Sequence, residues 1–178
     1  LLTREEKPTS GKIIVGGIDY ERLKDKDIPY LRRKIGTVFQ DFKLLPNKTA
    51  FENVAFALEV IGKSKHVIRT QVPEVLRLVG LEEKVNSYPD ELSGGEQQRV
   101  GIARAVVHKP RILLADEPTG NLDPELSSEI MALFRRFQNV GVTVLIATHD
   151  ITLINRMQLR IMHLEEGELT DDGAGYGR

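Results

Sequence analysis

Four residues at the start of a predicted helix, Ser93-Gly-Gly-Glu96, are suited to binding a phosphate group. The Ser93 hydroxyl can accept a hydrogen bond from the backbone N–H of Glu96, whose side chain reaches back to the N–H of Ser93 in a capping box. Gly94 and Gly95 leave backbone N–H groups uncovered in the first turn, and the helix dipole adds positive potential there. The pattern predicts a helix to about Lys109 whose start receives a phosphate oxygen. An ordinary helix start with close backbone packing is the alternative.

Two adjacent carboxylates, Asp116 and Glu117, follow the apolar run Ile112–Ala115. Neighbouring residues of an extended chain point to opposite sides, so the two acids can have different roles. In nucleotide hydrolases, one carboxylate at such a strand end holds Mg²⁺, commonly through water, and a second polarises the attacking water. A polar loop after a strand is the alternative interpretation of an isolated Asp-Glu pair.

His149 and Gln40 each follow a predicted strand at its carboxyl end. Ligands bind at that edge of open α/β sheets, so we expect His149 to lie along the same edge as Asp116. Taken alone, a histidine there is more often a hydrogen-bonded loop residue than a catalyst, and Gln40 by default is a capping or exposed amide.

The joint occurrence of these residues in one order favours the functional interpretation. The order is Gln40, Leu92–Glu96, Ile112–Glu117, Asn121-Leu-Asp123 and His149. At ordinary residue frequencies, the run Leu-Ser-Gly-Gly-Glu is expected by chance at roughly one position in a million.

Alternating strands and helices must position these residues. We expect strands at 11–18, 35–39, 112–115, 142–147 and 159–164, and helices at 22–34, 51–62, 68–79 and 93–109. A crossover helix begins after Asp123 as N-cap, with Pro124 at its first position. The runs at 112–115 and 142–147 are typical of strands buried on both faces of a parallel sheet, whereas Pro73 predicts a kink or break in its helix. The fold predicted is a parallel α/β core interrupted by a helical insertion at about 41–92.

Bulk composition is that of one globular domain with local recognition sites. The 178 residues carry 25 Lys and Arg against 26 Asp and Glu, a net charge of −1, which offers no global field toward nucleic acid. Cysteine is absent, so disulfides and thiolate metal sites are excluded. The longest apolar stretches, 54–61 and 142–147, are far shorter than the roughly 20 residues of a membrane-spanning helix.

Together these motifs resemble the Q-loop, signature, Walker B, D-loop and H-loop of the ABC ATPases, and the resemblance covers nearly the whole chain. It implies a nucleotide-binding domain with a P-loop NTPase (RecA-like) core over 1–40 and 105–168, a helical subdomain and signature helix over 41–104, and a flexible tail over 169–178. The ligands it implies are ATP and Mg²⁺, and the activity is ATP hydrolysis.

The same resemblance assigns a role to each matching residue. Asp116 supports Mg²⁺, Glu117 acts as general base, and His149 contacts the γ-phosphate. Gln40 contacts Mg²⁺ or the attacking water and senses a membrane partner. Ser93, Gly94 and Gly95 bind the γ-phosphate of ATP held by the opposite subunit of a homodimer, and Asp123 lines that junction.

Within the family, the runs Tyr30–Leu45 and Asp116–Asp123 are most similar to the ATPases of bacterial cell division. That likeness implies an FtsX-like integral membrane partner, control of cell-wall hydrolysis and a peripheral location on the cytoplasmic face of the inner membrane. The expected docking surface is the Gln40 loop with the helix from Phe51, although Phe56 and Val60 can instead pack within the helical insertion. Lipoprotein-release or macrolide-efflux ATPases, a non-hydrolysing interaction module and a protein acting on DNA or ribosomes are the alternatives.

One family motif is missing from these residues. The phosphate-binding loop Gly-x-x-x-x-Gly-Lys-Ser/Thr and its preceding adenine-stacking aromatic residue do not occur. We expect both to lie upstream of Leu1, and we expect these 178 residues alone to neither bind ATP tightly nor hydrolyse it.

Overall fold

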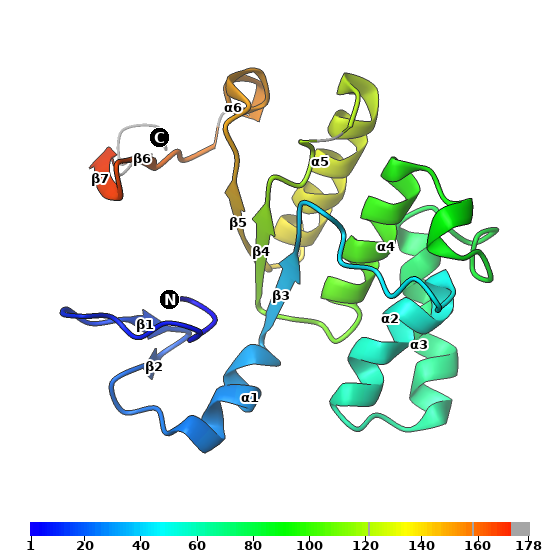
Figure 1. Cartoon of the computed structure of the whole chain (residues 1–178), viewed down its shortest axis with the longest axis horizontal. Helices are drawn as coiled ribbons and strands as arrows, with labels where there is room; N and C mark the ends of the chain where they lie inside the picture. Colours follow the sequence, from blue (N-terminus) through cyan, green and yellow to red (C-terminus); the bar gives the residue numbers. More distant parts are fainter. Residues whose placement is uncertain (121, 158, 172–178) are drawn as a thin grey trace. The chain divides into compact units, whose positions relative to one another are not determined.

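The computed structural model describes residues 1–120, 122–157 and 159–171, which fall into two compact units, one of Leu1–Ala147 and one that begins at Thr148. The centre of the first unit is a parallel sheet of β3 (Ile35–Val38), β4 (Ile112–Asp116) and β5 (Thr143–Ala147), in that order (Figure 1). Val38 pairs with Ala115, and Asp116 pairs with Ala147, so the carboxyl ends of the three strands meet at one edge.

Four helices accompany this sheet: α2 (Ala50–Val60), α3 (Lys65–Leu78), α4 (Gly94–Val106) and α5 (Pro124–Asn139). Helix α4 packs against β3 on one side and against α2 and α3 on the other, while α5 contacts β5 (Figure 1). The crossover helix begins as predicted, with Asp123 as N-cap and Pro124 first.

Two features of these elements differ from the predictions. Helix α3 is not divided at Pro73: it is continuous, because Val72 and Leu76 beside the proline are fully buried and this packing offsets the backbone hydrogen bond that proline removes. Strand β5 is not buried on both faces: its residues alternate between exposed and half-buried, and Leu145 is 37% exposed.

The segment before β3 forms a hairpin and a short helix. Strands β1 (Ile14–Val15) and β2 (Ile18–Asp19) are antiparallel and joined by Gly16 and Gly17, which both have positive φ as the tight turn requires. The single strand expected over 11–18 is therefore a hairpin. A 3₁₀ turn, Asp25–Asp27, leads into α1 (Ile28–Arg32), inside the predicted helical range. Tyr20, Leu31 and Ile35 form a small buried cluster here.

The second unit contains α6 (Ile151–Met157) and an antiparallel pair, β6 (His163–Glu165) and β7 (Glu168–Asp171), which turns at Gly167 as predicted. The strand expected over 159–164 overlaps β6 by two residues only. Residues 169–171 of the predicted tail lie in β7, and 172–178 lie outside the described residues. Within the part of the chain that the structure describes, no helix has the length and apolarity to cross a bilayer.

Candidate functional site

The carboxyl edge of the sheet gathers three of the predicted site residues. Asp116 is the last residue of β4 and is exposed, Glu117 follows it and is half-buried, and Gln40 lies two residues after the end of β3. Because Val38 pairs with Ala115, these residues leave the sheet at the same level.

Glu117 adopts a conformation that the sequence did not indicate. Its φ is +43°, in the left-handed region, and its N–H donates to the Ala147 carbonyl at 2.9 Å. The chain therefore turns at Glu117, and the two acids are separated by this turn and not by the alternation of an extended strand. Left-handed backbone at a non-glycine residue is a strain that proteins concentrate at functional sites.

Gly120 shows that Gln40 and Glu117 come together. A carbon built in place of a Gly120 hydrogen would lie 3.5 Å from Glu117 Cβ and 3.7 Å from Gln40 Nε2. The Gly120 N–H donates to the Glu117 backbone carbonyl at 3.1 Å, which folds the loop back onto Glu117. Glycine at 120 thus leaves room for the Gln40 amide and the base of the Glu117 side chain around one point at the sheet edge.

Gln98 supports this loop, and the sequence analysis missed it. The residue is fully buried in α4, and its Nε2 donates to the Pro118 carbonyl at 2.7 Å, one residue after Glu117. Its position between buried Gly95 and Ile102 at helical spacing is the signal that would have found it: a polar residue on the apolar face of a helix.

The start of α4 has the predicted capping box. The Glu96 N–H donates to Ser93 Oγ at 3.3 Å, and the Ser93 N–H donates to Glu96 Oε2 at 2.8 Å. This backbone hydrogen bond, the largest cause, together with nearby Lys84 Nζ at 3.5 Å, lowers the pKa of the Glu96 carboxyl. Ser93 and Gly94 are exposed, so this helix start is open to a ligand.

Gly95 has a different role from Gly94. It is buried, and a carbon built there would lie 3.0 Å from Leu126 Cδ1 of α5, whereas one at Gly94 meets nothing closer than 3.9 Å. Close packing therefore explains the second glycine, and Gly94 keeps an exposed backbone.

Asp123 is exposed and caps α5, with Oδ1 accepting from the N–H groups of Glu125 and Leu126, both at 3.0 Å. Asn121, which belongs to the same predicted loop, lies outside the described residues. His149 belongs to the unit that begins at Thr148, two residues beyond the end of β5, so its place beside Asp116 stays a prediction.

The oxygen atoms of Asp116 and Gln40 suit a hard cation. Mg²⁺ keeps several waters and is held by one or two protein oxygens together with substrate phosphates. Across the described ranges, no group of three or more His, Asp or Glu side chains is arranged to hold a metal. A Mg²⁺ site in which water and phosphate supply most of the ligands does not require three such side chains.

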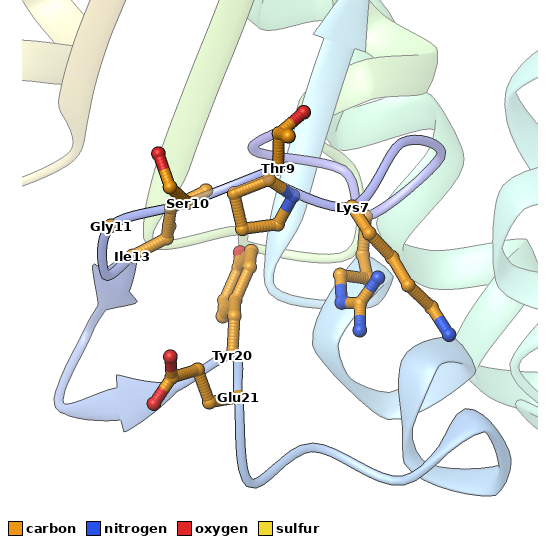
Figure 2. A pocket seen from close by; sticks show the side chains of 9 residues that line it. Lys7, Thr9, Ser10, Gly11, Ile13, Tyr20 and Glu21 are labelled. Atoms are coloured by element: carbon orange, nitrogen blue, oxygen red, sulfur yellow. The ribbon is translucent and has the colours of Figure 1, made fainter.

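A small cavity lies elsewhere in the first unit. It is lined by Arg4, Lys7, Pro8, Thr9, Ser10, Gly11, Ile13, Tyr20 and Glu21. Figure 2 shows Tyr20 in its wall and the Lys7 side chain extending away from that ring. None of the lining residues is a predicted site residue, so this cavity is separate from the sheet edge.

Helix α2 presents two apolar side chains to solvent. Phe56 is 42% exposed and Val60 is 62% exposed, while Val54 and Leu58 on the opposite side are fully buried. The alternative in which Phe56 and Val60 pack within the helical insertion is therefore wrong.

Comparisons with known proteins agree with this geometry. A family model described as ABC transporter matches residues 1–120. The cell division ATP-binding protein FtsE of Bacillus subtilis is 54% identical over 172 residues, covering 97% of this chain and 75% of that protein. FtsE of Escherichia coli K12 is 55% identical over 171 residues, covering 96% and 77%.

Solved structures show the same likeness. The dimeric ATP-binding cassette MJ0796 in a post-hydrolysis state bound to ADP and Pi has a TM-score of 0.81 and 40% identity, covering 93% of this chain and 74% of that one. CbiO1 of Clostridium perfringens, part of the ABC transporter complex cbiONQ, has a TM-score of 0.78 and 35% identity, covering 86% and 61%.

Proposed function

The chain belongs to the ABC transporter family, and from this premise we propose that it is the ATP-hydrolysing part of a membrane complex that acts in bacterial cell division. The sequence identity to FtsE proteins supports the role in cell division. The observation that carries the chemistry is the meeting of Gln40 and Glu117 around Gly120, next to Asp116, at the carboxyl edge of the parallel sheet.

In this proposal each side chain at the edge has one task. Glu117 accepts a proton from the water that attacks the γ-phosphorus, so that ATP and water give ADP and phosphate. Gln40 orients that water. Asp116 and Gln40 would hold Mg²⁺, which would supply positive charge against the phosphate oxygens. His149 contacts the γ-phosphate, as the resemblance to ABC ATPases implies.

A second copy of the protein completes the site. The exposed start of α4, with Ser93 and Gly94, offers N–H groups and the positive end of a helix dipole to the γ-phosphate bound by the opposite subunit. Gly95 lets that start pack closely on α5, and Asp123 fixes the beginning of α5 beside it. The related cassette MJ0796 is dimeric in a post-hydrolysis state bound to ADP and Pi, which supports a dimer here.

The proposed partner is an FtsX-like integral membrane protein that docks on α2. Phe56 and Val60 supply an apolar surface for a short amphipathic helix. Phe56→Glu should prevent co-purification of the membrane partner, while Val140→Glu, which changes a 78% exposed valine at the C-cap of α5, should not. Equal retention of the partner by both variants would remove α2 from this role.

Substitution of Glu117 tests the enzymatic role. In the complete protein with its phosphate-binding loop, Glu117→Gln should lower kcat for ATP hydrolysis by about 10²- to 10⁴-fold, the usual contribution of a general base. Glu125→Gln, which changes an exposed acid in the first turn of α5, is the matched control and should hydrolyse ATP normally. Near-normal turnover of Glu117→Gln would exclude it as the base.

Residues 1–178 alone lack the Lys and Ser/Thr that would bind the β- and γ-phosphates. We propose that this segment neither binds ATP tightly nor hydrolyses it. Titration with a fluorescent ATP analogue measures the difference from the complete protein, and equal affinities would contradict the proposal.

A further inference from the structure

We propose that Arg104 is a positioning residue for the ATPase site: from α4 it holds the loop after β3 in the conformation that presents Gln40 to Glu117. The inference rests on the proposed function for its kinetic consequence, because Gln40 acts on the attacking water there. The structural part, that Arg104 holds this loop, is tested independently of activity.

The loop after β3 contains two consecutive residues in a conformation that L-residues seldom adopt. Phe42 has φ +58° and Lys43 has φ +48°. The Lys43 N–H donates to the Asp41 carbonyl at 2.6 Å, so Phe42 is the centre of a three-residue turn with positive φ, the strained form of the γ-turn. Such backbone persists only where surrounding groups hold it.

Arg104 supplies that restraint from more than 60 residues away in the chain. Its Nη2 donates to the Phe42 carbonyl at 2.7 Å and its Nη1 to the Lys43 carbonyl at 2.6 Å. The planar guanidinium matches two adjacent oxygens as a fork, and a charged donor makes the stronger kind of hydrogen bond. Arg104 is half-buried, and this burial lowers the pKa of its guanidinium.

The surface of α4 next to these hydrogen bonds is in contact with the loop after β3. Gly101 lies one turn before Arg104, and a carbon built there would already lie 3.7 Å from the Phe42 carbonyl oxygen. The loop therefore contacts α4 directly, beside the two hydrogen bonds that Arg104 donates to it.

The restrained segment determines where Gln40 points. The Phe42 N–H donates to the Phe39 carbonyl at 3.2 Å, which closes a turn that contains Gln40 and Asp41. The hydrogen bond from Arg104 to Phe42 therefore also restrains this turn. The turn places the Gln40 amide next to Gly120 and Glu117. Arg104 thus acts through the loop, without touching the reacting groups.

Arg104→Met tests this role in the complete protein, since it removes the donors and keeps an unbranched apolar side chain. Loss of two charge-assisted hydrogen bonds should lower kcat about tenfold or more, with KM for ATP nearly unchanged. Amide hydrogen exchange should accelerate over residues 39–45 and stay constant over 94–100 of α4. Arg104→Lys, which cannot bridge two carbonyls as a fork, should show the same changes in smaller degree.

Arg136→Met is the matched control, because Arg136 also donates to a backbone carbonyl distant in the chain, that of Leu78 in α3 at 3.4 Å. It should leave kcat and the exchange of 39–45 unchanged.

Lys43→Gly separates positioning from a general effect on folding. Glycine adopts positive φ without penalty, so this change should restore part of the kcat lost in Arg104→Met and alter the unsubstituted protein little. The exposed ion pair between Lys43 and Asp41 that it removes contributes little.

Arg104→Met and Arg104→Lys with unchanged exchange over 39–45 would overturn the inference, as would a kcat loss that Lys43→Gly does not relieve. Failure of the proposed function has another signature: Glu117→Gln would then hydrolyse ATP normally.

Discussion

Gln98 offers a sharp test of the packing between α4 and the Glu117 loop. Its side chain is fully buried, its Nε2 donates to the Pro118 carbonyl, and its Oε1 has no hydrogen-bond partner. Gln98→Glu places a carboxyl of the same shape in this position. Burial raises the pKa of the introduced carboxyl, so the folded protein keeps it protonated, and its O–H can donate to Pro118 as the amide does.

The cost of this substitution depends on pH in a calculable way. An unfolded glutamate has a pKa of about 4.3, so the folded protein at pH 7 must bind a proton that the unfolded chain has released. At ~1.36 kcal/mol per pH unit, Gln98→Glu should lower the free energy of unfolding by about 1 kcal/mol at pH 5 and about 3.7 kcal/mol at pH 7. The loss grows as pH rises, because the pKa is raised in the folded state.

Urea denaturation at pH 5 and pH 7, each referenced to the unsubstituted protein, measures both values. Gln98→Met is the control: it has no ionisable group, so the cost of leaving the Pro118 carbonyl without its donor, about 1–3 kcal/mol, should be the same at both pH values. If Gln98→Glu lost the same free energy at both pH values, the side chain would not be in the dry environment described.

Three further predictions concern the same region. Gly36→Ala should destabilise the protein by about 1–3 kcal/mol in urea denaturation, because the methyl group meets the Ala105 backbone carbonyl, whereas Gly94→Ala, with open space, should not; equal unfolding free energies would contradict the contact. Glu96→Ala should cost about 1 kcal/mol by removing the capping box, while Glu96→Gln keeps the bond to the Ser93 N–H and should cost less, so an equal loss would refute the cap. Burial lowers the pKa of His108 below 6.5, although a hydrogen bond to the Ile35 backbone opposes the shift. The neutral ring therefore contributes stability above about pH 6.5 that is lost as pH falls, and His108→Gln should reduce the drop in Tm between pH 8 and pH 5; an unchanged drop would contradict this.

Local signals in the sequence were sufficient for the elements that carry their own start and register. Ser93 and Asp123 mark two helix starts by side chains that bond their own backbone, so α4 and α5 begin where predicted. The position of the site at the carboxyl edge of the sheet was predictable, because Gln40 and Asp116 directly follow the apolar runs that form two of the strands. Long-range packing was not accessible in this way: Pro73 inside α3 and the exposed face of β5 depend on which neighbours are present.

Backbone conformation at the site was the least predictable feature. Nothing in a glutamate at 117 or a phenylalanine at 42 indicates positive φ, because the conformation is imposed by groups distant in the chain, among them the Ala147 carbonyl and Arg104. The roles of Gln98 and Arg104 were not predictable for the same reason, because each side chain donates to a backbone carbonyl 20 or more residues away in the sequence.

Helix α4 contacts three other segments along its length: the first turn of α5 at Gly95, the turn after Glu117 at Gln98, and the segment after β3 at Arg104. Thirteen residues at ~1.5 Å each make a rod of roughly 20 Å that hardly stretches. Because the helix is stiff over this length, it fixes the distance between the Gln98 contact with the turn after Glu117 and the Arg104 contact with the segment after β3.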